Sequence, residues 1–249
     1  MTISSSSSAA VVSRGNLARL ADAVGVSGGE SDVRQVVLGL IKDRVADLLI
    51  DPLGSVIARR PGTGGSPLRI MISAHLDEVG LMVSNVGDDG LIETMAIGVL
   101  DPRYAPARRV VVGPDKIAGV LLWAPIHRNR SQSIVAPEDM RIDVGAEGRG
   151  GVRAEPGDRI AFWSEYTALT ESVARGKAFD SRAGCAVLIA LLDLLDNAPL
   201  PFDVHLVFSA QAHIGGRGAV VAANRIQPHA AFVLTGMPTN DLGVAILSF

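Results

Sequence analysis

The stretch RIMISAHLDEVG, residues 69–80, says most about the architecture of this chain. Its first six residues form a short apolar run, which is typical of a buried central strand in an α/β sheet. His75 then lies at the C-terminal end of that strand, where the ligand sites of open α/β sheets gather. One stretch therefore predicts both a buried sheet and a polar site at its edge.

On the N-terminal side of this strand the pattern alternates between helix and hairpin. A short helix is expected over residues 16–24 and a longer one over 32–46, where apolar residues recur at helical spacing. Residues 48–50 and 55–59 read as a β-hairpin. Residues 1–13, which contain a serine run, are expected to form a disordered tail.

From Gly80 onward the pattern changes to short alternating strands separated by turns, which is typical of a small β-barrel or sandwich. After residue 167 helices and strands alternate again. The fold class is therefore α/β, with a domain of residues 14–79 and 168–249 interrupted by an inserted β domain of residues 80–167. The strands of the insertion are expected at 81–86, 91–97, 109–112, 117–123 and 159–162, followed by a helix at 181–196, a strand at 203–209, a helix at 216–224 and a strand at 230–234.

Composition excludes several classes of function. The 249 residues are 48% hydrophobic and 20% charged, as in an ordinary globular protein, and the net charge of -3 attracts neither nucleic acid nor anionic membranes. No apolar run is long enough to span a membrane, and the N-terminus lacks a secretory pattern. The single cysteine, Cys185, permits no intramolecular disulfide, which fits a cytoplasmic location.

Four side chains are candidates for chemistry, and each has a plainer alternative. His75 could bind a zinc-like metal with Asp77 orienting its ring, or both could belong to a solvated strand end. Asp180 precedes an apolar helix and is either a metal-bridging carboxylate or the helix N-cap. His213 follows the strand at 203–209 and is either a ligand or a solvated loop histidine. Cys185 lies inside the apolar helix and is expected to pack there.

Taken together, these segments resemble metallopeptidase family forty-two, the glutamyl and deblocking aminopeptidases that form tetrahedral shells. The resemblance covers residues 17–241. It rests on an ordered set of motifs: VSG at 26–28, DPLG at 51–54, SAHLDEVG at 73–80, IGVLDPR at 97–103, IDVG at 142–145 and KAFDSRAGC at 177–185.

The resemblance implies a catalytic α/β domain with a PDZ-like insertion and two divalent metals, often zinc or cobalt. These metals hold a bridging water that attacks the peptide bond next to a free N-terminus, and a glutamate accepts the proton of that water. It also implies a homo-oligomer that assembles in part through the inserted domain. The partners are then peptide N-termini and further copies of the chain.

Transferred position by position, the resemblance makes His75 and Asp180 metal ligands and places Asp77 beside the first of them. The family's Glu-Glu pair, however, is Ala212-His213 here. Ala212 stands in place of the general base and cannot accept a proton, while His213 stands in place of a carboxylate ligand.

Two further ligand positions of the family also depart from its pattern. Thr235 stands in place of a ligand aspartate, although Asp241 could substitute, and the last ligand, a histidine, would lie beyond Phe249. The sequence therefore predicts weak or no binding of two metals and a protein that has lost most or all activity, a pseudoenzyme.

Two alternatives stay open at this point. One is a single-metal hydrolase that uses His75, Asp180 and His213, with Glu78 or Asp77 assisting a water. The other is a structural or regulatory subunit, whose inserted domain could add a peptide strand to its edge.

Overall fold

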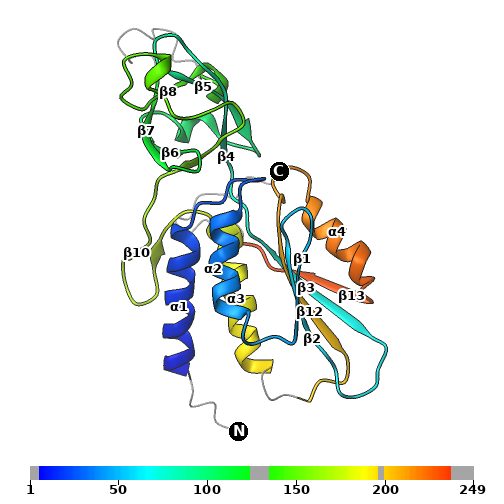
Figure 1. The fold of residues 1–249 in the computed structure, drawn as a ribbon. Helices are drawn as coiled ribbons and strands as arrows, with labels where there is room; N and C mark the ends of the chain where they lie inside the picture. Colours follow the sequence, from blue (N-terminus) through cyan, green and yellow to red (C-terminus); the bar gives the residue numbers. More distant parts are fainter. Residues whose placement is uncertain (1–5, 124–134, 196–198, 237–249) are drawn as a thin grey trace, which may run out of the picture.

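The computed structural model describes residues 6–123, 135–195 and 199–236 (Figure 1). Within these ranges a five-stranded sheet runs in the order β1-β2-β12-β3-β13. The predicted hairpin is present, and the predicted central strand lies between β12 and β13, both parallel to it. The strands of this sheet are β1 Asp47–Ile50, β2 Val56–Arg60, β3 Arg69–His75, β12 Asp203–Ser209 and β13 Ala230–Val233.

Helices cover both faces of the sheet (Figure 1). On one face α1 (Ser6–Asp22), α2 (Ser31–Ile41) and α3 (Phe179–Leu195) enclose the larger apolar core, into which β12 inserts Val204, Leu206 and Phe208. On the other face α4 (Arg217–Ile226) packs against a smaller cluster. Because side chains alternate along a strand, neighbouring residues of β12 serve opposite cores.

Two helix boundaries differ from the sequence expectation. α1 begins at Ser6, so residues 6–13, expected in a disordered tail, are helical; the alanines that follow the serines favour helix. α2 ends at Ile41, before the predicted end at residue 46. Arg44 lies just beyond it and bonds to the carbonyl oxygen of Ile189 and the carboxylate of Asp193 on α3.

The described part of the insertion forms a closed barrel in the order β4-β5-β8-β7-β6-β9, with antiparallel neighbours throughout. This confirms the predicted barrel. Its strand β8 was missed because three residues are too few for an alternating pattern to show. The barrel strands are β4 Gly80–Val86, β5 Ile92–Ile97, β6 Arg109–Val112, β7 Ile117–Leu122, β8 Arg141–Asp143 and β9 Arg159–Phe162.

Shorter elements complete the description. Three single turns of 3₁₀ helix lie in barrel loops, and a two-stranded hairpin follows the barrel. No helix among the described residues is both long and apolar enough to cross a membrane. These elements are η1 Pro102–Tyr104, η2 Pro137–Asp139, η3 Arg149–Gly151, β10 Thr167–Ala168 and β11 Ala174–Arg175.

The barrel stands on the edge of the sheet where β3 ends (Figure 1). Val26 packs with Val111 and Ala161 of the barrel in a small cluster that joins the two parts. Beside it, Arg159 Nε donates a 2.9 Å hydrogen bond to the carbonyl oxygen of Ser27. These contacts hold barrel loops close to the end of β3, where the candidate site lies.

Candidate metal site

The site is built at the C-terminal ends of two neighbouring parallel strands. β3 ends at His75 and β12 ends at Ser209, and these two residues are partners in the strand register. The chain that leaves β12 therefore passes directly beside His75 before α4 begins at Arg217. The predicted position of His75 at a strand end is confirmed, at the edge where ligand sites of such sheets occur.

Three of the four predicted side chains converge. Ligand atoms of His75, Asp77 and His213 all lie within 4.8 Å of one another. The two imidazole rings meet edge to face, with centroids 4.9 Å apart and an interplanar angle of 88°. The fourth side chain, Asp180, is adjacent, with Oδ2 3.6 Å from His213 Nε2. That distance is an electrostatic contact, too long for a hydrogen bond.

Asp77 organises this cluster from a fully buried position. Its Oδ2 accepts from Ser27 Oγ at 2.5 Å and from the His213 backbone N–H at 2.9 Å, and its Oδ1 accepts from the Ala212 N–H at 2.9 Å. Burial alone would raise the pKa of Asp77. The hydrogen bonds from His75, Ser27 and the two backbone amides outweigh it and hold that pKa far below its ordinary value. Asp77 is therefore an ionised anchor.

The tautomer of His75 follows from its neighbours. Nδ1 lies 3.1 Å from the backbone oxygen of Asp77 and 3.4 Å from its Oδ1. Both atoms are acceptors, so a neutral ring carries its proton on Nδ1. The Nε2 lone pair then remains available to a metal ion, which is the arrangement usual for metal-binding histidines.

Two buried carboxylates hold the loop that carries His213. Asp77 accepts from Ala212 and His213, and Glu30 Oε1 accepts from the Gln211 N–H at 2.9 Å. Burial raises the pKa of Glu30, and its backbone hydrogen bonds lower it by less. Gln211 itself adopts a left-handed conformation, with φ of 56°, which is uncommon for a residue with a side chain. The loop conformation is therefore specified by buried polar contacts.

Asp180 does not cap its helix. α3 begins at Phe179, so Asp180 lies in the first helical turn, and the N-cap alternative is wrong. A carboxylate in this turn is stabilised by the helix dipole. Its side chain is 47% exposed, and among the described residues only His213 contacts its oxygens. Thr235 Oγ1 donates to the Asp180 backbone oxygen at 3.2 Å, so the hydroxyl is already engaged.

Glu78 lies outside the cluster, although the sequence allowed it a role with water. Its Oε1 accepts from the Gly25 N–H at 3.0 Å and from Lys177 Nζ at 2.6 Å, and Arg182 lies 3.4 Å away. This buried carboxylate balances buried cations and joins the end of α1 to the start of α3. The prediction that Glu78 could assist a water is not supported by these contacts, and Asp241 lies outside the described residues.

Sequence reasoning missed Ser27 and Glu30. Both contact the site from the loop before α2, far from it along the chain. Ser27 belongs to a motif that the sequence singled out without a role, and Glu30 had no signal beyond being a carboxylate beside glycines. A pattern along one chain does not reveal which distant carboxylates will be buried together.

Comparison with known proteins identifies the class to which this fold and site belong. An aminopeptidase from the archaeon Desulfurococcus kamchatkensis superimposes with a TM-score of 0.85 at 32% identity, over 95% of this chain and 66% of that one. The TET1 peptidase of Pyrococcus horikoshii, described as assembling into a tetrahedron or a large octahedral shell, gives 0.82 at 28% identity, over 90% and 68%. This chain therefore shares its fold with solved structures of aminopeptidases.

Sequence comparison then fixes the family. The family described as M42 glutamyl aminopeptidase matches residues 54–244, so the chain belongs to the M42 peptidase family. A putative aminopeptidase of Acetivibrio thermocellus is 30% identical over 88% of this chain, and the lysyl aminopeptidase of Pyrococcus furiosus is 30% identical over 87%. The matched region of this chain spans 64% of each of these relatives.

Proposed function

We propose that this chain is an M42 peptidase scaffold that holds at most one divalent ion and no longer runs the two-metal aminopeptidase reaction. The observation that carries the proposal is Ala212. By resemblance it occupies the place of the general base, and its methyl group has no lone pair to accept a proton. Its backbone N–H is bonded to Asp77, which keeps the residue inside the site.

The donor set fits one ion better than two. Two close divalent cations repel each other strongly and need several carboxylates to offset that repulsion. Both oxygens of Asp77 are already engaged by donors, and the Thr235 hydroxyl is engaged by a backbone oxygen. In the part of the chain that the structure describes, this leaves the exposed carboxylate of Asp180 and the two imidazoles of His75 and His213 as donors.

His75, His213 and Asp180 would hold the single ion. Two nitrogens and one oxygen form a donor set that suits zinc or cobalt, and three protein ligands are the usual number in a catalytic zinc site. A bound divalent ion would polarise a carbonyl oxygen or lower the pKa of a water. Asp77 contributes by holding the His75 ring and the His213 backbone in place.

Among the described residues, the site lacks a side chain placed to accept a proton from a water. Removal of a general base typically costs about 10²–10⁴ in rate. Asp77 cannot replace it, because its oxygens are engaged and its pKa is held far below its ordinary value. Glu78 is bonded to Gly25 and Lys177 instead. Among the described carboxylates, only Asp180 keeps an exposed oxygen near the imidazoles.

An aminopeptidase assay tests this proposal. The full chain is incubated with a set of unblocked dipeptide amides in the presence of zinc, cobalt or manganese, and the release of N-terminal residues is measured. The His75→Ala variant, which removes a ligand, is the control. The proposal expects equal, near-background rates for both proteins. Robust metal-dependent release by the unmodified chain alone would overturn it.

A single-metal hydrolase is the second candidate, and the convergence of His75, Asp77 and His213 favours it. It predicts metal-dependent hydrolysis that disappears in His213→Ala. A third candidate is a role as a subunit of an assembly. The related TET1 peptidase is described as assembling into a tetrahedron or a large octahedral shell, and we propose that this chain also forms a homo-oligomer through its barrel.

A further inference from the structure

A cavity separate from the candidate metal site lies on the face of the sheet that α4 partly covers. Its volume is about 570 Å³, and it is bordered by the N-terminal ends of β3 and β12. The candidate metal site lies at the opposite ends of the same strands. Since β3 has seven residues, the two places are separated by about 20 Å along the strand. The cavity is therefore distinct from the metal site.

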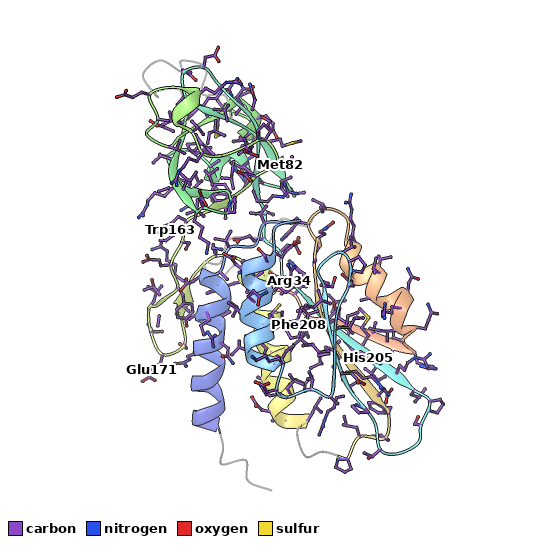
Figure 2. All side chains as sticks on the ribbon, viewed as in Figure 1. Arg34, Met82, Trp163, Glu171, His205 and Phe208 are labelled. Atoms are coloured by element: carbon purple, nitrogen blue, oxygen red, sulfur yellow. The ribbon has the colours of Figure 1, made fainter. Side chains whose placement is uncertain are left out.

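His205 of β12 lines this cavity, and one of its ring nitrogens has no hydrogen-bond partner among the residues that the structure describes. The residue is only 9% exposed, and its Nε2 is buried without a hydrogen bond among the described residues. In Figure 2 His205 lies on the α4 side of the sheet, whereas Phe208 lies on the side of α2 and α3. Burial lowers the pKa of His205, which favours the neutral ring. Buried polar atoms in proteins normally have hydrogen-bond partners, so the unpaired nitrogen sets His205 apart from the other buried polar residues of the sheet.

The charges around the cavity are unbalanced. Three arginines and two aspartates line it, which leaves one positive charge beside the neutral His205. Arg59 bonds to both carboxylates, Asp47 and Asp203, at 2.8 Å each. The other two arginines have no carboxylate partner in the part of the chain that the structure describes.

These two arginines differ in how firmly they are held. Arg69 donates to the backbone oxygens of Ile226 and Gln227, which orients its guanidinium group at the end of α4. Arg225, in the last turn of α4, is exposed, and its guanidinium group forms no ion pair or hydrogen bond within residues 6–123, 135–195 and 199–236. One guanidinium group is thus positioned in advance, and the other is free to close on a ligand.

We propose that this cavity binds a small organic anion through a phosphate or carboxylate group. Guanidinium groups are suited to both oxyanions because their donors form a planar fork. Arg69 and Arg225 would receive the oxyanion, and the neutral His205 ring, which lines the cavity, would lie beside it. Apolar side chains such as Leu48 and Ile226 line the remaining space and would cover the body of the ligand.

Calorimetric titration of the full chain at low ionic strength tests the proposal with three probes: inorganic phosphate, phenyl phosphate and benzoate. Saturable binding of at least one probe, with one site per chain, is expected. Arg225→Gln should weaken it on the order of tenfold, because a charged hydrogen bond is lost. Stronger binding of phenyl phosphate than of benzoate would identify the phosphate group as the one recognised, and the reverse would identify the carboxylate.

Arg175→Gln is the matched control, because Arg175 is an exposed arginine on β11 away from the cavity. It should leave the affinity unchanged. His205→Gln adds a second test from inside the cavity and should also weaken binding. The proposal fails if no probe saturates at millimolar concentration, if Arg225→Gln binds as the unmodified chain does, or if Arg175→Gln weakens binding equally.

Discussion

Asp77 is the residue on which the geometry of the candidate site depends. It accepts hydrogen bonds from one side chain of the loop before α2 and from two backbone amides of the loop after β12. It also lies beside Nδ1 of His75. A buried carboxylate with this many donors is a positioning group, which explains how the loop with His213 stays close to β3.

Substitution of Gly98, in the loop that follows β5 of the barrel, tests how tightly His213 is packed. Its φ of 81° lies in the left-handed region, and a Cβ atom there would lie 3.0 Å from Cβ of His213. Gly98→Ala should therefore lower the free energy of unfolding by about 1 kcal/mol for the backbone alone, with a further loss from the contact. It should also weaken zinc binding, because His213 must move.

Gly145→Ala provides the control, since Gly145 has a φ of 76° and open space around it. Chemical denaturation and zinc titration of both variants separate backbone strain from steric contact. Equal effects of the two substitutions on zinc affinity would show that Gly98 does not position His213.

Cys185 should be inert in the folded protein. Its side chain is fully buried, and Sγ contacts the backbone oxygen of His75 at 3.2 Å. Burial raises the pKa of the thiol to about 12, so at pH 8 the thiolate fraction is on the order of 10⁻⁴. We expect no maleimide labelling of the native chain and one label per chain after denaturation in urea. Rapid labelling under native conditions would contradict the buried position.

At the scale of elements, the start of α3 is joined to α1 and to the end of β3 by a buried arginine. Arg182 donates to the backbone oxygens of Leu20, Ala23 and Leu76 and lies 3.4 Å from Glu78. Since Asp180 precedes Arg182 in the same helix, these bonds also fix the Asp180 backbone, and with it the proposed ligand carboxylate, relative to His75.

Arg182→Met should be strongly destabilising. It removes the arginine donor from the buried carbonyl oxygens of Leu20 and Leu76 and a cation from beside the buried Glu78, whereas the Ala23 oxygen keeps its bond from Lys177 Nζ. The loss of one partner from such a network typically costs about 3–5 kcal/mol. Urea denaturation followed by circular dichroism measures the change. Arg175→Met, at an exposed position, should cost less than about 0.5 kcal/mol. A similar small loss for Arg182→Met would contradict the role assigned to it.

The elements also show which parts of the structure could be predicted from the sequence. Apolar runs and periodicity located β3, β12 and α3, and with them His75, Asp180 and His213, because the ends of these elements follow from local patterns. The short strand β8 and the early start of α1 were missed, because they depend on pairing and context. Ser27, Glu30 and the contacts of Glu78 were missed for the same reason, since they arise only when distant segments meet.

At the scale of the whole molecule, the barrel is fixed to the sheet by packing and by charge. Val26 joins the two parts in one apolar cluster, and Lys116 forms a 2.6 Å ion pair with Asp32. Assembly through an outer surface of the barrel would therefore also orient the candidate site of each copy. This orientation of the sites depends on the proposed homo-oligomer, whose formation through the barrel can be tested.

Val120 tests whether the barrel mediates assembly. It lies on β7 and is 39% exposed, so a lysine there is tolerated by the fold and would disrupt an apolar contact between copies. Val120→Lys should shift the chain toward smaller species in size-exclusion chromatography with light scattering. Val220→Lys on α4, where the valine is 57% exposed, is the control and should leave the size unchanged. An unchanged size for Val120→Lys would count against this surface.

The number of ions per chain tests the central claim most directly. The full chain is loaded with excess zinc, passed through a desalting column and measured by mass spectrometry of the metal, alongside His213→Ala and the control His229→Ala. We predict no more than one zinc per chain, lost in His213→Ala and retained in His229→Ala. Two zinc ions per chain, retained after desalting, would contradict the account.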